Sequence, residues 1–464
     1  MHYFWLTVFI KPAIIVSNMN VQKKTKSGKF WQGLFDSIRW LAPGLGVKRW
    51  LFLILVGTTL IGIGFGIFIL DIYRNTPPDA RAWWLTLLST VSLRALDRPL
   101  RVIIFSGIGV GILLGSIYGL YRALLSPYVR PGKTVVDTLA GHRRRERGPR
   151  IVVIGGGHGL AMLLRGLKKF THNLTAVVTV ADDGGSSGRL RRTMGILPPG
   201  DIRNCLAALS NDEALMTQLF QYRFANDSTE LNGHSFGNLF ISALAEITGS
   251  FEGAVAESGR VLAVHGRVLP SSLRDVRLVA DIVPPNTQQE IRVSGESRIP
   301  VTKGSIRRVW LEPDNPPAYP AVIKALLSAD MIVIGPGSLF TSIIPNLLVP
   351  DIFAAIQTSA ALKIFVCNVA TQAGETDGFS VSDHIRALEN HVGSGLFELL
   401  ICNQRHEGEL LDGMDWVKMG ENTVANYPVY QADLNSDEEP WHHDETKLAQ
   451  VLIDIFQDRT GPVL

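Results

Sequence analysis

One stretch of the sequence, IVVIGGGHGL at residues 151–160, constrains the fold more than any other. Four β-branched residues run directly into a cluster of glycines, and apolar residues at helical spacing follow. This pattern predicts a buried strand, a tight turn and a helix whose N-terminus favours an anion. A plain strand-to-helix turn is the alternative, because G-G-G-x-G is not the dinucleotide spacing G-x-G-x-x-G. We interpret the turn as a phosphate cradle made by Gly155, Gly156, Gly157 and Gly159.

Beyond this stretch the sequence alternates between strand-like and helix-like segments. The pattern predicts an α/β fold with a doubly wound, mostly parallel sheet of the Rossmann type over residues 151–464. In such sheets ligands bind outside the carboxyl ends of the strands, where the connecting loops lie. Strands are predicted at 174–180, 277–282, 306–311, 331–334, 364–368 and 399–402, and helices at 202–210, 237–248, 252–264, 319–327, 350–361, 382–391 and 446–456.

The first 150 residues differ in charge from the rest of the chain. They hold 21 Lys and Arg against 6 Asp and Glu, a net charge of +15, whereas the remainder has a net charge of −12. The larger part of the chain therefore gives no reason to expect nucleic-acid binding. Three widely spaced cysteines without a CxxC pair exclude a disulfide framework and a cysteine zinc site, and they fit a reducing compartment.

Two uncharged apolar runs lie in this basic region, at 51–70 and 102–121. Each is long enough to cross a bilayer, and glycines at four-residue spacing would let the two helices pack closely. Buried core helices are the alternative. Basic residues dominate both outer flanks, although five arginines in the connecting loop weaken that bias. We predict a two-span hairpin in the inner (cytoplasmic) membrane, with the large domain in the cytoplasm.

Four regions follow from these features. They are a basic N-terminal segment at 1–49, the transmembrane hairpin at 50–122, a basic linker at 123–150 and the α/β domain at 151–464. The first 20 residues lack a basic start and a clear cleavage site, so no signal peptide is predicted. The linker either lies on anionic membrane lipid or forms a solvated tether.

A second loop, VADDGGSSGR at 180–189, directly follows a predicted strand. Asp182 and Asp183 are candidate ligands for a divalent metal ion or a ribose. A turn in which the acids cap the next helix is the alternative, but such a turn needs fewer acids, glycines and hydroxyls than this loop holds. The remaining candidates allow close backbone approach or donate to phosphate oxygens: Gly184, Gly185, Ser186 and Ser187.

Two further polar motifs precede predicted helices, LPPGDIRN at 197–204 and GHSFGN at 233–238. In the simplest interpretation Asp201 caps its own helix, while Arg203 and Asn204 in the first turn can face a phosphate or a base. A serine hydrolase is not predicted, since adjacent Ser and His residues are not a triad and G-x-S-x-G is absent. We expect these residues to orient a base or a sugar: Asp201, Asn204, His234 and Asn238.

A third junction of strand and glycine loop is IGPGSLFTS at 334–342. Gly335, Gly337 and Ser338 are expected to line a diphosphate, and Asn368, at the end of the next strand, is expected to help orient the base or sugar. Asp383 and His384 either reach the same cleft or begin a helix. Three glycine and hydroxyl loops at strand ends predict a diphosphate ligand.

Together these motifs resemble the YvcK family of gluconeogenesis factors, which is related to the CofD 2-phospho-L-lactate transferases. The resemblance covers roughly Arg150–Leu464. Two positions depart from the family pattern, which usually has Thr at His158 and Tyr at Phe340. The segments that carry the resemblance are IGGGHGL, VTVADDGGSSGRLR, LPPGDIRNCLAALS, GHSFGNL, IGPGSLFTSIIPNLLV, VCNVATQAGETDGFSVSDHI and HHDETKLA.

The resemblance implies a CofD-like fold that binds a nucleotide diphosphate, with UDP-sugars as the favoured ligands. No cofactor is required, and Mg²⁺ is expected only together with the diphosphate. The implied role is non-catalytic control of cell shape and cell-wall synthesis during gluconeogenic growth. The implied partners are cell-wall synthesis proteins, membrane lipid and a second copy of the chain.

Two enzymatic alternatives stay open at this point. A CofD-type transferase would move a phospholactyl group from a nucleotide diphosphate to an acceptor hydroxyl, with Asp182 and Asp183 holding the metal. A nicotinamide dehydrogenase is the weaker alternative, because the glycine spacing is wrong for it.

Overall fold

The computed structural model describes residues 144–461 except 211–213, 226–229, 286 and 421–426, together with isolated positions between residues 55 and 114. The chain divides into two compact units, Met1–Gly141 and His142–Leu464. In the first unit the few described positions within the two apolar runs, such as Gly62 and Gly111, are helical. The basic N-terminal segment and most of the predicted hairpin and of the basic linker lie outside the described residues, and all three stay predictions.

Within the described parts of the chain, no single helix has the length and apolar character needed to cross a membrane. Two sharply bent helix pairs reach that length and hydropathy only in combination, Phe236–Thr248 with Phe251–Val261 and Leu339–Leu347 with Pro350–Thr358.

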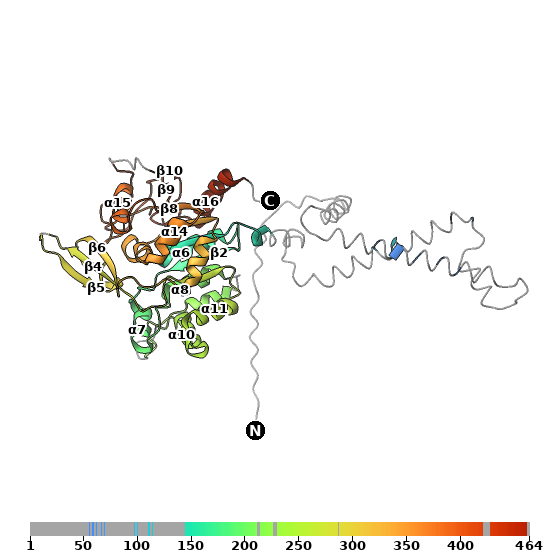
Figure 1. Ribbon diagram of the computed structural model, residues 1–464, viewed down its shortest axis with the longest axis horizontal. Helices are drawn as coiled ribbons and strands as arrows, with labels where there is room; N and C mark the ends of the chain where they lie inside the picture. Colours follow the sequence, from blue (N-terminus) through green and yellow to red (C-terminus); the bar gives the residue numbers. More distant parts are fainter. Residues whose placement is uncertain are drawn as a thin grey trace, which may run out of the picture. The chain divides into compact units, whose positions relative to one another are not determined.

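The second unit is built on a seven-stranded sheet in which every pair of neighbouring strands is parallel, which confirms the predicted mostly parallel sheet. Its spatial order is β10-β9-β8-β7-β1-β2-β3 (Figure 1). All residues of β1, β2, β7 and β9 are buried, as expected for parallel strands covered on both faces. The strands are β1 Ile151–Gly155, β2 Leu174–Val178, β3 Arg267–Pro270, β7 Met331–Ile334, β8 Leu362–Val366, β9 Leu399–Asn403 and β10 Val429–Ala432.

The helices that flank the sheet fall into two packed groups. α6 packs against α8 and α16, whereas α12 packs against α14. The sheet grows from β1 in both directions, and because parallel crossovers are right-handed, this reversal places the two groups on opposite faces. The helices are α6 Gly157–Leu167, α7 Gly185–Met194, α8 Gly200–Leu209, α9 Ala214–Gln221, α10 Phe236–Thr248, α11 Phe251–Val261, α12 Pro320–Leu327, α13 Ile344–Leu347, α14 Pro350–Thr358, α15 Val381–Val392 and α16 Glu445–Thr460, with a π-helix, η4, at Leu339–Ile343.

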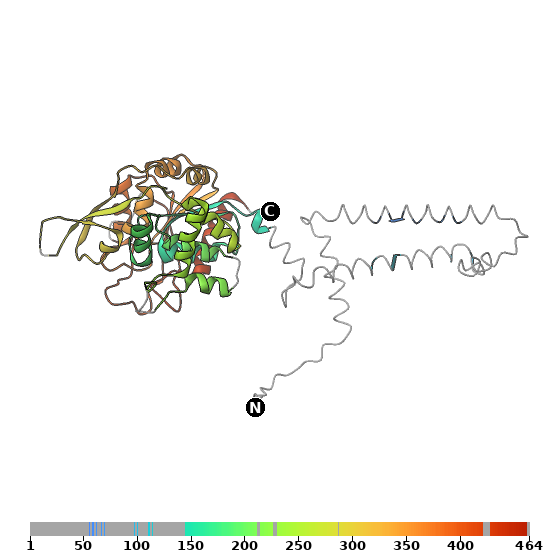
Figure 2. The same cartoon turned by 90° about the horizontal axis from the view of Figure 1, so that it is seen from below.

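The strands predicted at 277–282 and 306–311 do not join this sheet. They are β4 (Arg277–Val283) and β6 (Ser305–Glu312), which with β5 (Ile291–Ser294) form a separate antiparallel sheet in the order β5-β4-β6. Parallel pairing needs a crossover of a dozen or more residues, usually a helix, and only the short 3₁₀ helix η3 (Glu296–Arg298) lies between these strands among the described residues. Figures 1 and 2 show the three strands projecting from the body of the unit as a ribbon.

Most predicted boundaries agree with the structure to within a few residues. β8 ends at Val366, so Asn368 lies in the following loop and does not end the strand as predicted. β3, β5 and β10 were not predicted, and each is only four residues long. The equally short β7 was predicted because all four of its residues are apolar, whereas β3, β5 and β10 mix apolar residues with polar residues or proline.

Candidate functional site

The loops after β1, β2 and β7 lie together at the carboxyl edge of the main sheet. β1 pairs with β2 on one side and with β7 on the other, so the ends of the three strands are neighbours. The direction in which strands are added reverses at β1. The crevice outside such a switch point is where open α/β sheets bind ligands. The three predicted glycine loops therefore meet where a ligand is expected.

Close packing requires the glycines after β1. A Cβ on Gly156 would lie 2.7 Å from Oδ2 of Asp201, and a Cβ on Gly159 would lie 2.8 Å from the backbone oxygen of Pro336. Gly157 has φ +64°, in the left-handed region that favours glycine. The loop after β1 thus touches both the start of α8 and the loop after β7.

Asp201 reaches the N-terminus of α6. Its carboxylate accepts a hydrogen bond from the backbone N–H of Gly157. Burial, with repulsion from Asp182, raises the pKa of Asp201 to about 6 despite that hydrogen bond. The alternative in which Asp201 caps its own helix is wrong, because the N-cap of α8 is Pro199. A protein carboxylate already occupies part of the helix end that the sequence marks as a phosphate cradle.

Carboxyl groups gather between the loop after β2 and η3. Asp182 accepts from the N–H of Gly184 at 2.8 Å, and Asp183 accepts from the N–H of Ser297 at 2.9 Å. Burial is the largest cause that raises the pKa of Asp182. The pKa of Glu296 rises to about 8, through burial first and then repulsion from neighbouring carboxylates. Across the described residues, no three His, Cys, Asp or Glu side chains are placed to share one metal ion.

The turn into α7 brings Ser187 against the start of α8. Gly184 is the N-cap of α7, and exposed Gly185 follows with φ +45°. The hydroxyl of Ser187 hydrogen-bonds Asp182. A Cβ on Gly200 would lie 2.4 Å from Oγ of Ser187, so glycine at this position lets α8 begin directly beside α7.

Ser186, His234 and Asn238 form a buried hydrogen-bonded chain. Nδ1 of His234 lies 3.0 Å from Oγ of Ser186, and Nδ2 of Asn238 donates to the same Oγ at 3.1 Å. Burial, followed by the charges of Arg189 and Arg223, lowers the pKa of His234. Oγ of Ser186 therefore joins the ring of His234 to the amide of Asn238.

Arg203 and Asn204 lie side by side in the first turn of α8. Nη1 of Arg203 donates to Oγ of Ser235 at 2.5 Å, and Nη2 donates to Oδ1 of Asn204 at 2.8 Å. Ser235 is also the N-cap of α10, where its side chain accepts from the N–H of Asn238. The first turn of α8 and the GHSFGN segment therefore share one polar network.

Side chains from the loop after β8 hold the loop after β7. Nδ2 of Asn368 donates to the carbonyl of Gly337 at 2.9 Å, and Oδ1 accepts from the N–H of the same glycine at 3.3 Å. Gln372 donates to Oγ of Ser338 at 2.9 Å. Gly335 and Gly337 both have positive φ, which this tight turn requires. Asn368 therefore supports the glycine loop with both of its polar atoms.

Three buried or half-buried polar residues beside these loops were not among the predicted site residues: Glu296, Asn346 and Glu375. Nδ2 of Asn346 donates to the carbonyls of Gly155 at 2.9 Å and Ser342 at 2.8 Å. Burial raises the pKa of Glu375 to about 7, although it accepts from the Thr341 hydroxyl. Glu375 could have been predicted from the polar segment TQAGET in which it lies. Asn346 sits in an apolar run, which gives no such indication.

Asp383 and His384 begin a helix and are not part of this edge's polar network. Ser380 and Asp383 form a capping box at the start of α15, and Nδ1 of His384 lies 2.8 Å from the carbonyl oxygen of Ser380. The helix-start alternative is confirmed for both residues.

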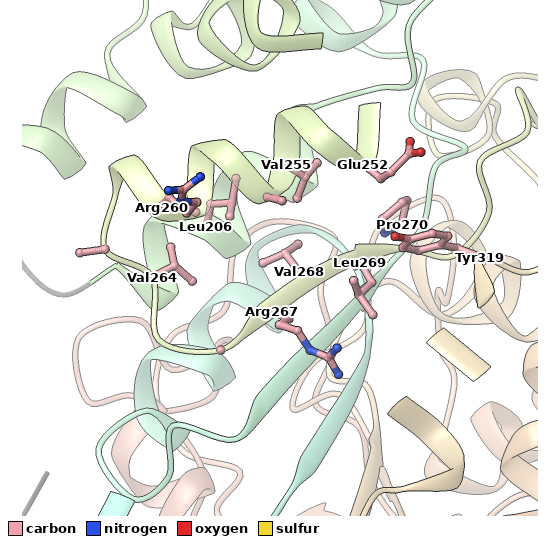
Figure 3. Close-up of a pocket in the computed structure, with 14 residues that line it drawn as sticks. Leu206, Glu252, Val255, Arg260, Val264, Arg267, Val268, Leu269, Pro270 and Tyr319 are labelled. Atoms are coloured by element: carbon pink, nitrogen blue, oxygen red, sulfur yellow. The ribbon is translucent and has the colours of Figure 1, made fainter. Parts of the chain in front are cut away.

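A separate groove of about 340 Å³ runs between α11 and β3 (Figure 3). Apolar side chains line much of it, among them Leu206, Val255 and Val268, while Glu252 and Arg260 lie toward opposite ends of α11. None of the predicted site residues lines this groove.

The fold and this edge define an α/β protein whose candidate ligand site lies at the switch point of a parallel sheet. The family profile described as "2-phospho-L-lactate transferase CofD" matches residues 151–460. The chain belongs to the CofD family, and its relatives are named gluconeogenesis factors, which confirms the resemblance to the YvcK family.

Individual relatives agree with this assignment. A protein of Nostoc sp. strain PCC 7120 with a gluconeogenesis-factor description is 50% identical over 374 residues, 79% of each chain. The "Gluconeogenesis factor" of Bacillus subtilis strain 168 is 43% identical over 325 residues, 67% of this chain and 99% of its own. A crystal structure of a UPF0052 family member from Bacillus halodurans, 41% identical, matches with a TM-score of 0.61 and covers 66% of this chain and 99% of that chain. That relative therefore folds as a counterpart of the second unit alone.

Proposed function

We propose that the second unit binds a nucleotide diphosphate, with a UDP-sugar as its ligand, and acts as a non-catalytic regulator. The observation that carries the proposal is the meeting of three glycine and hydroxyl loops at the switch point beside β1. Backbone N–H groups and hydroxyls in such loops are suited to phosphate oxygens. The buried amide and imidazole of Asn238 and His234 are suited to a base or a sugar.

Mg²⁺ fits this edge as a companion of the diphosphate. Magnesium is usually held by one or two carboxylates together with substrate phosphates, so Asp182 and Asp183 suffice. The raised pKa values of Asp182, Asp201 and Glu296 reflect crowded negative charge that a bound cation would relieve. The ion would neutralise the diphosphate.

The proposed cellular role follows from the relatives' names and from the N-terminal sequence. The ligand would report the supply of activated sugar during gluconeogenic growth, and the protein would adjust cell shape and wall synthesis accordingly. Its two predicted spans would anchor it to the inner membrane, where wall precursors are assembled. Cell-wall synthesis proteins, membrane lipid and a second copy of the chain are its proposed partners.

Calorimetry tests the binding step directly. Residues 142–464, the second unit, are titrated with UDP-N-acetylglucosamine, and then with uridine and N-acetylglucosamine separately, with and without Mg²⁺. Saturable binding of the intact UDP-sugar, with much weaker binding of either part, is expected. Absence of binding at millimolar concentration refutes the proposal.

A CofD-type transferase is the second candidate, favoured by the family profile over residues 151–460. Mg²⁺ held by Asp182 and Asp183 would supply charge neutralisation for the leaving nucleotide phosphate. Replacing both aspartates with Asn should abolish any metal-dependent turnover of a nucleotide-diphosphate donor. Turnover that persists in that double variant removes this mechanism.

A further inference from the structure

The guanidinium of Arg203 is a buried charge without a carboxylate partner among the described residues. The residue is only 7% exposed, and both hydrogen-bond acceptors on its Nη atoms, in Ser235 and Asn204, are uncharged. Its Nε is buried and has no hydrogen-bond partner in the described part of the chain. Among the described residues no Asp or Glu oxygen forms an ion pair with Arg203. A buried charge that lacks a counterion is costly, and an arginine fork with a free donor suits an oxyanion.

One further arginine, Arg223, adds positive charge near this guanidinium. Burial and then the charge of Arg223 lower the pKa of Arg203. Arg189 donates to the carbonyl of Asn232, and Arg223 donates to the carbonyl of Gly233, so neither has a carboxylate partner in the part of the chain that the structure describes. Among the described residues the opposing charges that act on Arg203 are those of Asp201 and Asp182, and neither makes an ion pair with it.

The neighbouring elements hold Arg203 in place. A Cβ on Gly237 would lie 2.9 Å from both Cγ and Cδ of Arg203, so the first turn of α10 packs directly on the arginine stem. Arg203 shares the first turn of α8 with Asp201, whose Oδ2 would lie 2.7 Å from a Cβ on Gly156, so this turn lies beside the start of α6. That helix end is partly occupied by Asp201, whose carboxylate accepts from Gly157. Repulsion from the Asp201 carboxylate therefore favours a phosphate position beside Arg203 over one directly at the N-terminus of α6.

We infer that Arg203, with the charge of Arg223 near it, forms an oxyanion pocket that receives a phosphate group of the bound ligand. The identity of the ligand as a nucleotide diphosphate rests on the proposed function, whereas the phosphate pocket itself does not. The pocket selects for a phosphate dianion or diphosphate and against an uncharged nucleoside or sugar. Arg203 supplies the charge and the free N–H, and Ser235 and Asn204 fix the plane of its guanidinium.

The test measures affinity and stability in the same variants of residues 142–464, a unit whose counterpart in Bacillus halodurans folds on its own. The probes are inorganic pyrophosphate and UDP-N-acetylglucosamine, measured by calorimetry. Arg203→Met removes the charge, Arg203→Lys keeps the charge but loses the fork, and Arg260→Met is the control on α11, where the side chain is 78% exposed. Thermal unfolding of the ligand-free protein is recorded for each variant.

The expected result is that Arg203→Met weakens pyrophosphate binding by about 10-fold or more, while Arg203→Lys weakens it less and Arg260→Met leaves it unchanged. The ligand-free Arg203→Met protein should unfold at the same or a higher temperature, since an unpaired buried charge is removed. If Arg203→Met does not fold, Arg203→Lys must still weaken pyrophosphate binding, and wild-type affinity in that variant overturns the inference.

The outcomes separate this inference from the proposed function. If the wild-type protein and Arg203→Met bind UDP-N-acetylglucosamine with equal affinity, the pocket is overturned and the proposed function still stands. Arg203-dependent binding of pyrophosphate without any binding of the UDP-sugar supports the pocket and refutes the proposed ligand. Binding of neither probe overturns both. Lower stability of Arg203→Met with unchanged affinity shows that the arginine is only structural.

Discussion

The carboxylate of Asp201 accepts a hydrogen bond from the backbone N–H of Gly157, so an acid carried by α8 lies at the N-terminus of α6. The sequence pattern alone would leave that helix end open for a phosphate. The contact instead places a carboxylate there, close enough to Asp182 and Glu296 for their charges to interact. A metal ion bound with the proposed diphosphate would relieve this crowded negative charge.

The first prediction concerns the pH dependence of stability. Because the pKa of Asp201 is raised to about 6 in the folded state, the unfolded state loses its proton first, and the stability that this group contributes falls as pH rises from about 4 through 6. Asp201→Asn should therefore leave stability unchanged near pH 4 and raise it by up to about 3 kcal/mol at pH 7.5. Urea unfolding of residues 142–464 at both pH values measures this. A loss of stability at pH 7.5 would contradict the assignment.

The second prediction concerns the coupling of Asp201 to Glu296. The pKa of Glu296 is raised to about 8 by burial and by the charges of other carboxylates, Asp201 among them. Glu296→Gln alone should stabilise the protein at pH 8 and not at pH 4.5. In the double variant with Asp201→Asn, the gain should fall short of the sum by about 1 kcal/mol. Strict additivity would show that the two groups do not interact.

The third prediction tests the contact between the loops after β1 and β7. A Cβ on Gly159 would collide with the backbone oxygen of Pro336, which cannot move aside as a flexible side chain could. Gly159→Ala should lose about 1–3 kcal/mol of stability and weaken ligand binding. Gly259→Ala is the matched control, because its Cβ would meet only side-chain atoms at 3.8 Å. That helical control should be neutral or slightly stabilising in the same denaturation experiment. Equal behaviour of the two variants would argue against the close contact.

The fourth prediction concerns Asn346, which is fully buried and joins the carbonyls of Gly155 and Ser342. Asn346→Ala leaves both carbonyls without this donor, so the free energy of unfolding should drop by about 2–4 kcal/mol. Gln450→Ala, which removes an exposed hydrogen bond to Asp454, should cost less than about 0.5 kcal/mol. A small effect at Asn346 would mean that water replaces its amide.

The sequence was most informative where the chain is locally regular. Buried strands such as β1 and β7 follow from short β-branched runs, and the glycine loops follow from their composition. The partners of those loops could not be predicted, because each contact joins residues far apart in the chain. Glu296 approaches Asp182 only because the chain folds back after β5, and no local sequence pattern predicts that contact.

The same reason limits what the sequence says about individual roles. The alternative in which Asp201 caps α8 is wrong, and its carboxylate contacts α6 instead. The expected role of Asn368 in orienting a base or sugar stays a prediction, and in the structure both of its polar atoms bond Gly337. In both cases the residue type was recognised and its partner was not, since polar side chains satisfy whichever buried donors the fold brings near.

Phosphorus NMR of residues 142–464 with Mg²⁺ and UDP-N-acetylglucosamine tests the central claim most directly. The account predicts broadened or shifted diphosphate signals and no new phosphorus species over hours, as expected for a protein that binds the ligand without consuming it. Appearance of UMP, UDP or free phosphate would contradict the regulator and favour the transferase. Diphosphate signals identical to those of the free ligand would contradict the claim that this edge of the sheet binds a nucleotide diphosphate.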